Sequence, residues 1–215
     1  KIFYEKKLYI ITPVSRIENL SKIFKSINWN YVTKWIIVYD KKIIKKNPYL
    51  FKNIPSVVEL LNFTKNSIRG SGQRNTGIEY LLKEKKKNSF VYFLDDDNII
   101  HPNFYNIYKK FKDENIYTFS QQVKIRHIRA GNKFKLYHID TAMFVTSLTI
   151  IKNIRWKMKT HETDYHFIKE CLSKNKNRYV CINNVGCYYN YLSDNLIKRN
   201  IKKFKTFVYN NLFKF

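Results

Sequence analysis

The stretch Phe90-Val91-Tyr92-Phe93-Leu94-Asp95-Asp96-Asp97-Asn98 decides how this chain can fold. Its first five residues are apolar and rich in β-branched and aromatic side chains, which is typical of a buried strand. Three carboxylates follow directly, although the whole chain has 16 acidic residues against 41 basic ones. Negative charge concentrated at the end of one strand is costly unless a cation or hydrogen-bond donors meet it. The sequence therefore predicts a ligand site at the edge of a sheet.

Buried strands followed by helices recur through the first half of the chain. Strands are predicted over 8–11, 35–39 and 56–63, and helices over 16–27, 73–82 and 102–111. Thr12-Pro13 is expected to close the first strand and Asp40 the second. This pattern predicts a mostly parallel sheet covered by helices, in which ligands bind beyond the carboxyl ends of the strands. The polar strand exits should therefore share one site with Asp95–Asp97.

The second half of the chain is more mixed. Strands are predicted over 116–125 and 133–145, with a turn at Gly131, followed by a helix over 162–172 and short strands over 179–182 and 187–191. Residues 196–215 have apolar positions at helical spacing with lysines between them, which predicts a basic amphipathic helix. The expected fold class is α/β, with a mostly parallel sheet flanked by helices and a smaller mixed sheet in the second half.

The charge and the cysteines restrict the partners. The 215 residues suit one domain, and the net charge of +25 favours polyanions such as nucleic acid, anionic membranes or phosphorylated ligands. Lysines spread along the chain also fit a simple compositional bias. The three cysteines form no CxxC pair and no zinc spacing. There is no signal peptide or apolar run of membrane-spanning length, and the chain does not begin with Met. A cytoplasmic protein and a domain of a larger protein both remain open, so the localisation is left unassigned.

The aspartates predict a site for a hard cation. Oxygen ligands suit Mg²⁺ or Mn²⁺. Successive strand residues point to opposite faces, so one or two aspartates should hold the metal while another meets a hydroxyl or a cation. An exposed acidic turn is the structural alternative. About 20 residues earlier, the loop Arg69-Gly70-Ser71-Gly72-Gln73-Arg74-Asn75 precedes a helix. Its arginines and glycines suit a phosphate or carboxylate cradle, although a flexible surface loop has the same composition.

Several of these segments together resemble one family of glycosyltransferases. They are the first strand with Thr12-Pro13, the second strand with Asp40, Arg69-Gly-x-x-Gln-Arg-Asn, and Val91-Tyr92-Phe93-x-Asp-Asp-Asp-Asn. In this order they resemble the β-1,3-glucuronyltransferase-like family, which has the GT-A fold, a Rossmann-like sheet flanked by helices. Residues 139–145 resemble its acceptor-side strand, and His161-Glu162-Thr163-Asp164 resembles the segment that bears its catalytic base. The family's late histidine has no counterpart in 187–191.

The resemblance implies a role for each matching residue. Thr12 and Pro13 would line the nucleotide pocket and Asp40 would contact the uracil. Arg74, with Arg69 nearby, would meet the nucleotide or its phosphates. Asp96 would hold the ribose and Asp97 would bind Mn²⁺ or Mg²⁺. Asp95 would orient the donor sugar through an arginine and is the second candidate metal ligand. Asp140 would touch acceptor or donor hydroxyls.

The catalytic base is expected to be Glu162 or Asp164, with Glu162 favoured. Two positions apart on a helix, they face different directions, so only one should reach the site. Both carboxylates also suit a helix N-terminus, which is the structural alternative. Nearby Trp156 is positioned to stack on a sugar. A single base without an enzyme nucleophile implies inversion at the anomeric carbon.

The predicted function is metal-dependent transfer of a sugar from a UDP-sugar to a hydroxyl of a glycan, glycoprotein or glycolipid. The transferase domain is expected to span 1–195, with a nucleotide-sugar half over about 1–112 and an acceptor half over about 113–195. Residues 196–215 either contact an anionic membrane surface or pack on the domain. Two alternatives stay open: a nucleic-acid-binding protein driven by charge, although no specific nucleic-acid motif is present, and a nucleotidyltransferase using the same metal site.

Overall fold

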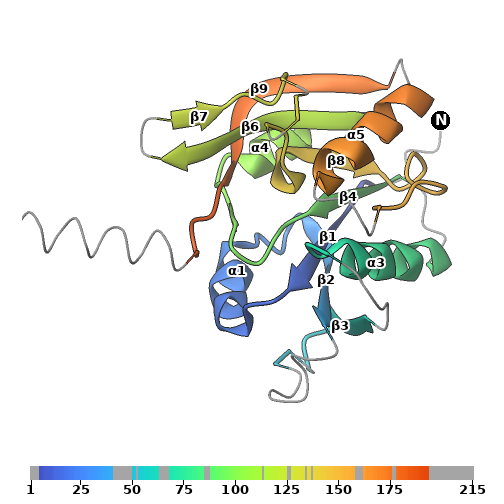
Figure 1. The fold of residues 1–215 in the computed structure, drawn as a ribbon. Helices are drawn as coiled ribbons and strands as arrows, with labels where there is room; N and C mark the ends of the chain where they lie inside the picture. Colours follow the sequence, from blue (N-terminus) through green and yellow to red (C-terminus); the bar gives the residue numbers. More distant parts are fainter. Residues whose placement is uncertain are drawn as a thin grey trace, which may run out of the picture.

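The computed structural model describes residues 5–40, 50–51, 53–62, 68–84, 88–112, 114–124, 127–133, 135–136, 138–157, 162–175 and 178–193 (Figure 1). The strands are β1 (Lys7–Val14), β2 (Val32–Asp40), β3 (Val57–Asn62), β4 (Ser89–Phe93), β5 (Ile99–Ile100), β6 (Ile116–Lys124), β7 (His127–Arg129), β8 (Phe144–Ser147) and β9 (Tyr179–Tyr188). The helices are α1 (Leu20–Ser26), α3 (Ser71–Lys83), α4 (Phe104–Lys109) and α5 (Thr163–Lys174), with 3-10 turns at Ile17–Asn19 and Thr141–Met143. The helix predicted over 196–215 lies outside the described residues.

One sheet runs through both halves of the described chain. Its strand order is β3-β2-β1-β4-β8-β6-β9-β5, and β7 pairs with the edge of β6. The first four strands are parallel, β4–β8 and β8–β6 are antiparallel, and β6–β9 is parallel again. The α/β fold class predicted from the sequence is therefore confirmed. The mixed part continues the parallel sheet through the β4–β8 pair, so the carboxyl end of β4 lies at the junction of the two halves.

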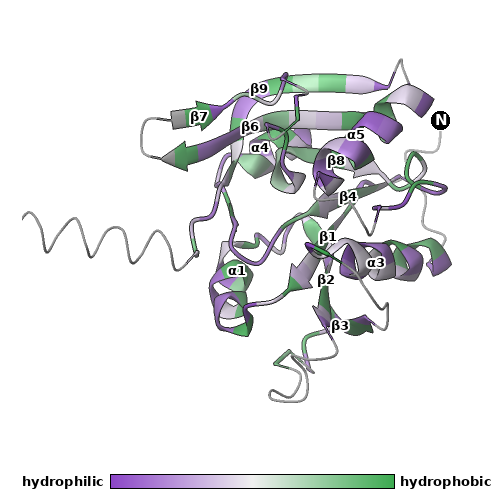
Figure 2. Ribbon diagram, in the orientation of Figure 1, coloured by the Kyte–Doolittle hydropathy of each residue, from purple (hydrophilic) through white to green (hydrophobic). Residues whose placement is uncertain are grey.

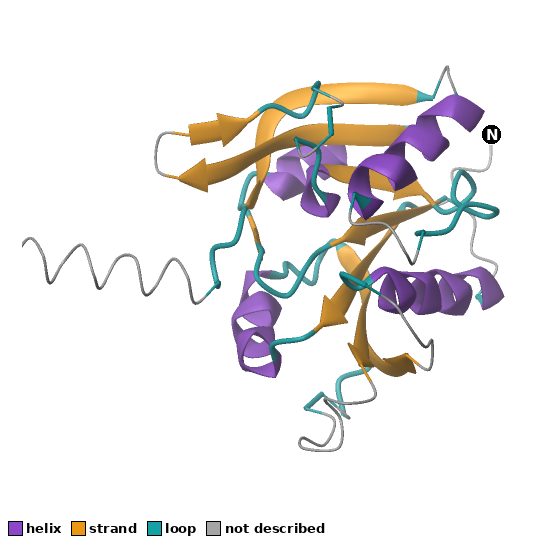
Figure 3. Cartoon of the chain, in the orientation of Figure 1, coloured by secondary structure: helices purple, strands orange, loops and turns teal. Residues whose placement is uncertain are grey.

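Helices cover both faces of this sheet (Figure 3). Alternate residues of β4 point to opposite faces: Phe90 and Tyr92 belong to the apolar core beneath α1 and α4, whereas Val91 and Phe93 belong to the core beneath α3 and α5. Helices α1 and α3 carry both apolar and polar residues along their length (Figure 2), as helices with one buried face do. Burial on both faces explains why the central strands are continuous apolar runs.

Helix α3 lies unusually close to β1. A Cβ atom on Gly77 would stand only 2.7 Å from Cγ2 of Ile11, so the approach of this helix to the strand requires a glycine there. Close packing fixes α3, and with it the loop at its N-terminus, against the carboxyl end of β1. No helix among the described residues has the length and apolar content needed to cross a membrane.

Three predictions about secondary structure need correction. The first strand does not close at Thr12-Pro13 but continues to Val14, because both residues still pair with Ile37 and Val38 of β2. The strand predicted over 133–145 is wrong for most of its length. Asp140 caps a 3-10 turn by accepting a hydrogen bond from the N–H of Ala142 at 3.1 Å, and β8 begins only at Phe144.

The two short strands predicted near the end of the domain form the single strand β9, which pairs in parallel with β6 over most of its length. The sequence also gave no indication of β5 or β7. Both strands are only two or three residues long, and they form because they pair with longer neighbours: β5 with β9, and β7 with β6.

Candidate active site

The three aspartates form a turn directly after β4. Leu94 is fully buried and its N–H donates to the carbonyl of Ile11 at 3.0 Å, which ties the end of β4 to β1. The N–H of Asn98 donates to the carbonyl of Asp95 at 3.0 Å and closes the turn. The turn directs Asp96 and Asp97 toward Arg16, whereas Asp95 faces Arg74 and Thr141.

Asp96 is buried and holds the segment that follows β1. Its Oδ2 accepts hydrogen bonds from the N–H and hydroxyl of Ser15, at 2.5 and 2.9 Å, and from the N–H of Arg16 at 2.6 Å. Its Oδ1 pairs with the Arg16 guanidinium. Burial raises the pKa of Asp96, while the donors on Ser15 and Arg16 oppose the rise. Both oxygens of Asp96 are therefore bound by protein donors. Through them Asp96 connects the turn after β4 to the segment after β1.

Asp97 is the least satisfied of the three carboxylates. Its side chain is 15% exposed, and its Oδ2 lies 3.1 Å from Nη1 of Arg16. Within the described part of the chain, its Oδ1 has no hydrogen-bond partner. Burial and the neighbouring charge of Asp95 raise the pKa of Asp97 to about 7, although Arg16 opposes the rise. A carboxylate in this condition gains from a second cation.

Asp95 points toward the second half of the chain. One oxygen pairs with Nη2 of Arg74, and the other accepts a hydrogen bond from the hydroxyl of Thr141 at 3.0 Å. Thr141 belongs to the 3-10 turn that Asp140 caps. Asp95 therefore links α3, which carries Arg74, to the start of β8.

Arg74 is nearly inaccessible, at 3% exposure, and its orientation is fixed by several contacts. Nη1 donates to the carbonyl of Arg69 at 2.7 Å, and the guanidinium lies 4.8 Å from the ring centroid of Trp156. Burial lowers the pKa of Arg74, but Asp95 and Asp164 outweigh it and leave the pKa above its usual value. Arg74 is a permanent buried cation among carboxylates.

Asn75, the next residue of the Gln73-Arg74-Asn75 segment, holds Trp156 in place. Its amide nitrogen donates to the carbonyl of Trp156 at 3.0 Å, and its amide oxygen accepts from the N–H of Trp156 at 2.8 Å. The indole is stacked on Phe167, with ring centroids 4.1 Å apart and planes 2° apart, and is 2% exposed. With Arg74 and Phe167 against it, Trp156 has no face open to a sugar, contrary to the sequence-based expectation.

The loop before α3 has a left-handed backbone. Arg69 has φ 47° and Gly70 has φ 74°, and a Cβ atom on Gly70 would stand 2.8 Å from Cβ of Pro13. Non-glycine residues rarely adopt positive φ, and such conformations are most often found where function requires them. The loop lies against the end of β1, which places Arg69 and the helix N-terminus beside the aspartate turn.

Three carboxylates from the second half line a pocket of about 170 Å³. They belong to Asp140, Glu162 and Asp164, and the remaining lining residues are Arg69, Arg129, Ile139, Tyr165 and Tyr189. Gln121 donates from Nε2 to Oδ1 of Asp140 at 3.1 Å. Burial, followed by the charge of Asp95, raises the pKa of Asp140. The pocket thus adjoins the group formed by Asp95 and Arg74.

Asp164 and Glu162 occupy the start of α5. Asp164 lies in the first turn and accepts a hydrogen bond from the Thr163 hydroxyl at 3.2 Å. Burial raises the pKa of Asp164 to about 7; the Arg74 charge opposes the rise, while Asp140 adds to it. Glu162 is the N-cap residue and is partly exposed. Both carboxylates line the pocket, contrary to the expectation that only one would reach it.

The remaining predicted residues, Thr12, Pro13 and Asp40, lie near the carboxyl ends of β1 and β2. Thr12 is fully buried, and its hydroxyl accepts a hydrogen bond from Nε1 of Trp35 at 2.9 Å. Pro13 contacts the Gly70 loop. Asp40 ends β2, beside Asn62 of β3, and its strand lies two positions from β4, roughly 10 Å at normal strand spacing. The structure thus gathers Arg69, Arg74, Asp95–Asp97, Asp140, Glu162 and Asp164, with Asp40 further along the same edge.

Sequence reasoning missed several residues of this site: Ser15, Arg16, Gln121, Arg129 and Thr141. Ser15 and Arg16 directly follow the first strand, so their position at a strand exit was a usable signal. Gln121 and Arg129 reach the site through the pairing of β6 with β7, and Thr141 reaches it through the 3-10 turn before β8. Neither feature has a local signature in the sequence.

The chemistry of Asp97 fits a divalent cation as a single protein ligand. The described residues contain no group of three or more His, Cys, Asp or Glu side chains arranged to hold a metal. Both oxygens of Asp95 and of Asp96 are engaged, which leaves Asp97. Mg²⁺ and Mn²⁺ at phosphate-transfer sites commonly take one or two carboxylates and complete their shell with substrate phosphates and water. One available carboxylate is therefore sufficient if the ligand brings phosphates.

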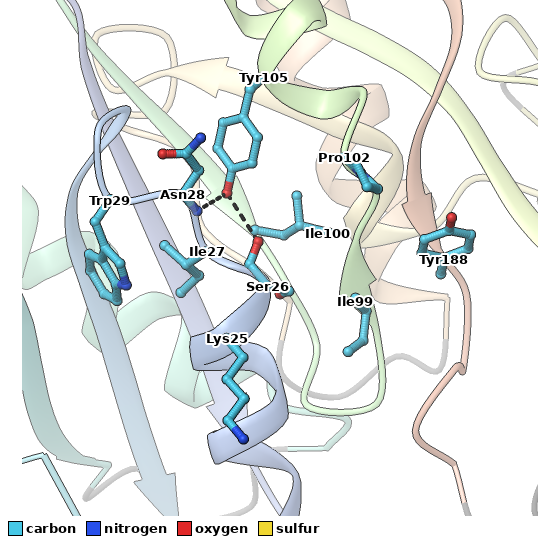
Figure 4. Close-up of a pocket in the computed structure, with 10 residues that line it drawn as sticks. All are labelled: Lys25, Ser26, Ile27, Asn28, Trp29, Ile99, Ile100, Pro102, Tyr105 and Tyr188. Atoms are coloured by element: carbon cyan, nitrogen blue, oxygen red, sulfur yellow. Dashed lines mark hydrogen bonds between the residues drawn. The ribbon is translucent and has the colours of Figure 1, made fainter.

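A larger pocket, of about 630 Å³, lies where the end of α1 meets β5 and α4 (Figure 4). Its lining is mostly apolar and aromatic: Lys25, Ser26, Ile27, Asn28, Trp29, Ile99, Ile100, Pro102, Tyr105 and Tyr188. The Tyr105 hydroxyl accepts from the N–H of Asn28 at 2.7 Å and donates to the carbonyl of Ser26 at 3.4 Å. Its lining contains no carboxylate, histidine or thiol, so it lacks the acidic groups that are gathered around Asp95–Asp97.

Comparisons with known proteins find likeness in structure but not in sequence. No protein-family model matches the chain, and no curated protein matches it. Among solved structures, TarS from S. aureus superposes with a TM-score of 0.61 at 15% identity, over 86% of this chain and 36% of TarS. The chain thus spans little more than a third of the length of TarS.

Two other neighbours match over more of their own length. Glucosyl-3-phosphoglycerate synthase from Mycobacterium tuberculosis, solved with Mn²⁺, UDP and phosphoglyceric acid, gives a TM-score of 0.54 at 10% identity over 94% of this chain and 78% of its own. A putative glucose-1-phosphate thymidylyltransferase from Bacillus anthracis gives 0.53 at 11% identity, over 92% and 94%. None of these neighbours tests the resemblance to the β-1,3-glucuronyltransferase-like family, which stays a prediction. The chain has a GT-A-like fold, which it shares with TarS, glucosyl-3-phosphoglycerate synthase and the thymidylyltransferase.

Proposed function

We propose that this chain is a metal-dependent glycosyltransferase that moves a sugar from a UDP-sugar to an acceptor hydroxyl, acting on a glycan, glycoprotein or glycolipid. One observation carries the proposal: Asp97 is the one of the three consecutive aspartates with an oxygen that no described residue engages, and its charge interacts with Asp140, which lines a pocket with Asp164 and, like Asp164, has a raised pKa. A diphosphate leaving group and an acceptor hydroxyl need these two kinds of site next to each other.

On the donor side, Asp97 would hold Mn²⁺ or Mg²⁺ together with the donor diphosphate. The cation would supply positive charge to the departing diphosphate. Asp96 keeps the Ser15–Arg16 segment at the mouth of the site, and Asp95 is held by Arg74 on one side and Thr141 on the other. Arg74, which is 3% exposed and paired with Asp95, would act through Asp95 rather than by touching the nucleotide.

On the acceptor side, Asp164 is our candidate for the general base. Its pKa of about 7 matches a group that must take up a proton near neutral pH. Arg74 and Asp140 act on its charge, so the base is electrostatically connected to the donor side. Glu162, favoured from the sequence, lines the same pocket and is the alternative base.

The reaction balances without a protein nucleophile. The carboxylate takes the proton of the acceptor hydroxyl, the acceptor oxygen forms a bond to the anomeric carbon, and the bond from that carbon to the UDP oxygen breaks. UDP leaves with the electron pair, and the anomeric centre inverts. Asp140 and Gln121, which are hydrogen bonded to each other, would orient sugar hydroxyls in the pocket.

The direct test is a screen of nucleotide sugars for UDP release in the presence of Mn²⁺ or Mg²⁺. We expect release with at least one UDP-sugar, loss of release with EDTA, and at least a hundredfold lower turnover for Asp164→Asn, in line with typical general-base contributions of about 10²–10⁴. If Glu162→Gln, and not Asp164→Asn, removes turnover, the base assignment reverts to Glu162. Release that is indifferent to EDTA contradicts the proposal.

A nucleotidyltransferase is the second candidate. It is favoured by the thymidylyltransferase neighbour, whose chain is matched over 94% of its length. Analysis of the products separates the two activities, because glycosyl transfer releases UDP whereas nucleotidyl transfer from a nucleoside triphosphate releases pyrophosphate. Pyrophosphate formed from UTP and a sugar phosphate would establish the second candidate.

A further inference from the structure

We propose that the pocket beside Asp140 recognises a carboxylate or phosphate group on the sugar donor or acceptor, and that Arg129 is the residue that binds it. This inference rests on the transferase function proposed above and deepens it, because it names the chemical class of the substrate. Arg129 lines this pocket together with a second arginine, Arg69, and with the carboxylates of Asp140 and Asp164.

Arg129 is positioned by the edge of the sheet. It lies in β7, where it pairs with Gln121 of β6, the residue whose side chain donates to Asp140. Its guanidinium carbon lies 4.7 Å from the ring centroid of Tyr189. Stacking on a tyrosine fixes the plane of a guanidinium and leaves the N–H groups at its rim free to bind.

Within the described part of the chain, the Arg129 side chain makes no hydrogen bond and has no carboxylate within 4.0 Å, although it lines the pocket. A guanidinium carries five N–H donors in a planar fork that matches the two oxygens of a carboxylate or phosphate. The charge of Arg129 is felt by Asp140 and lowers its pKa, against the larger effect of burial. Arg129 is thus near the reacting groups without being neutralised by them.

Arg69 lines the same pocket from the other half of the chain. It is exposed and has the left-handed φ of 47°, and its carbonyl is held by Arg74 at 2.7 Å. Two arginines therefore border one small pocket, one from the loop before α3 and one from β7. Arginines that converge on a pocket are the usual arrangement for anionic groups.

The pocket includes Asp164, the proposed general base. Asp140 and Asp164 line it, and burial and the charges of Asp140 and Asp97 raise the pKa of Tyr189, which carries Arg129 on its ring. A volume of about 170 Å³ is smaller than the roughly 300–1,000 Å³ of pockets that enclose a drug-sized ligand. A group bound there would be one sugar ring or one acidic substituent, close to the bond that forms.

The charged residues that line the pocket should also make it distinguish acidic from neutral sugars. Carboxylates line the pocket, so an anion is repelled unless its oxygens face the arginines. A neutral sugar offers Arg129 only hydroxyl acceptors, which form weaker hydrogen bonds with a guanidinium than carboxylate or phosphate oxygens do. The pocket should therefore prefer an acidic substrate in one orientation over its neutral analogue.

Calorimetry on the full chain with matched probe pairs tests this inference. One pair, UDP-glucuronate and UDP-glucose with Mn²⁺, examines the donor as the source of the anion. The other pair, glucose 6-phosphate and glucose added to the UDP–Mn²⁺ complex, examines the acceptor. Arg129→Gln removes the charge, Arg129→Lys keeps the charge without the fork, and Arg178→Gln is a control at an exposed arginine.

We expect the charged member of one pair to bind about 10- to 100-fold tighter, as hydrogen bonds to charged groups predict. Arg129→Gln should reduce that preference to less than threefold, Arg129→Lys should restore part of it, and Arg178→Gln should leave it unchanged. Equal binding in both pairs, or a preference that survives Arg129→Gln, would overturn the inference. UDP–Mn²⁺ binding should be the same in all these variants; its absence in the unmodified chain would instead contradict the transferase function.

Discussion

Nη1 of Arg16 lies 3.1 Å from Oδ2 of Asp97, and the same nitrogen also pairs with Asp96. Arg16 therefore occupies part of the coordination space of Asp97, the one of the three consecutive aspartates with an oxygen that no described residue engages. An arginine in this position lowers the electrostatic cost of gathering three carboxylates, and it must share or release Asp97 when a divalent cation binds.

Removing the Arg16 charge should strengthen binding of the free metal. We expect Arg16→Gln to bind Mn²⁺ about tenfold tighter in the absence of nucleotide, because loss of a competing cation at this distance is worth more than 1 kcal/mol at an effective dielectric constant of about 20. Titration of Mn²⁺ followed by electron paramagnetic resonance measures this affinity. Arg178→Gln, which removes an exposed charge elsewhere, should change nothing. Weaker Mn²⁺ binding in Arg16→Gln would mean that Arg16 supports the metal site instead of competing with it.

The Asn75 amide makes both hydrogen bonds to the backbone of Trp156. Asn75→Ala should lower the free energy of unfolding by about 2–3 kcal/mol, since two hydrogen bonds are lost and buried backbone groups are left unsatisfied. Urea unfolding measures the change. Asn106→Ala, at an exposed helix position, should cost less than about 0.5 kcal/mol. If Asn75→Ala lowers the free energy of unfolding no more than Asn106→Ala does, Asn75 does not hold the Trp156 segment.

Gly70 combines a φ of 74° with a close approach to Pro13. Gly70→Ala should destabilise the chain by about 1–3 kcal/mol, because alanine is strained at positive φ and its Cβ would be 2.8 Å from Pro13. UDP binding should weaken as well, since the loop carries Arg69. Thermal unfolding and calorimetry measure the two effects. Normal stability together with normal UDP affinity would mean that the loop can shift without consequence for the site.

The pH dependence of turnover should report Asp164. A general base works only when deprotonated, and the pKa of Asp164 is raised to about 7. The logarithm of kcat/KM should therefore rise with unit slope below about pH 7 and level off above it. A profile that is already flat at pH 5 would exclude Asp164 as the base and would fit a carboxylate of ordinary pKa.

The raised pKa of Asp164 should also make the free energy of unfolding depend on pH. A carboxyl group whose pKa is higher in the folded than in the unfolded state binds more protons when folded between the two values. Its contribution to stability is therefore present at low pH and is lost as the pH rises from about 4 through about 7. Asp164→Asn should remove this part of the pH dependence, with each kilocalorie per mole worth about 2–4 °C in the unfolding midpoint of a chain this size. Identical slopes for both proteins would contradict the raised pKa.

The sequence was most informative where a local pattern decides the structure. The run from Phe90 to Leu94 is buried on both faces, so it could be assigned to a central strand without any long-range knowledge. The aspartates that follow, and the Arg74-Asn75 pair at the start of a helix, could be placed at strand exits for the same reason. The general position of the site was therefore predictable.

Contacts between distant segments were not predictable. Arg16 and Asp96 are 80 residues apart, and nothing near Arg16 indicates that its N–H and guanidinium both meet that carboxylate. Arg129 reaches the pocket only because β7 pairs with β6. The strand predicted over 133–145 was wrong because Asp140 uses its side chain to cap a turn, a competing hydrogen bond that strand propensity does not reflect.

Of the three consecutive aspartates, Asp97 is the proposed ligand of the divalent cation that binds together with the UDP diphosphate. Calorimetric titration of UDP with and without Mn²⁺, on the unmodified chain, Asp97→Ala and the exposed-site control Glu18→Ala, tests this directly. We predict Mn²⁺-dependent UDP binding in the unmodified chain and in Glu18→Ala, and at least a hundredfold weaker binding in Asp97→Ala. UDP binding that is unaffected both by EDTA and by Asp97→Ala would contradict the proposed metal-dependent transfer.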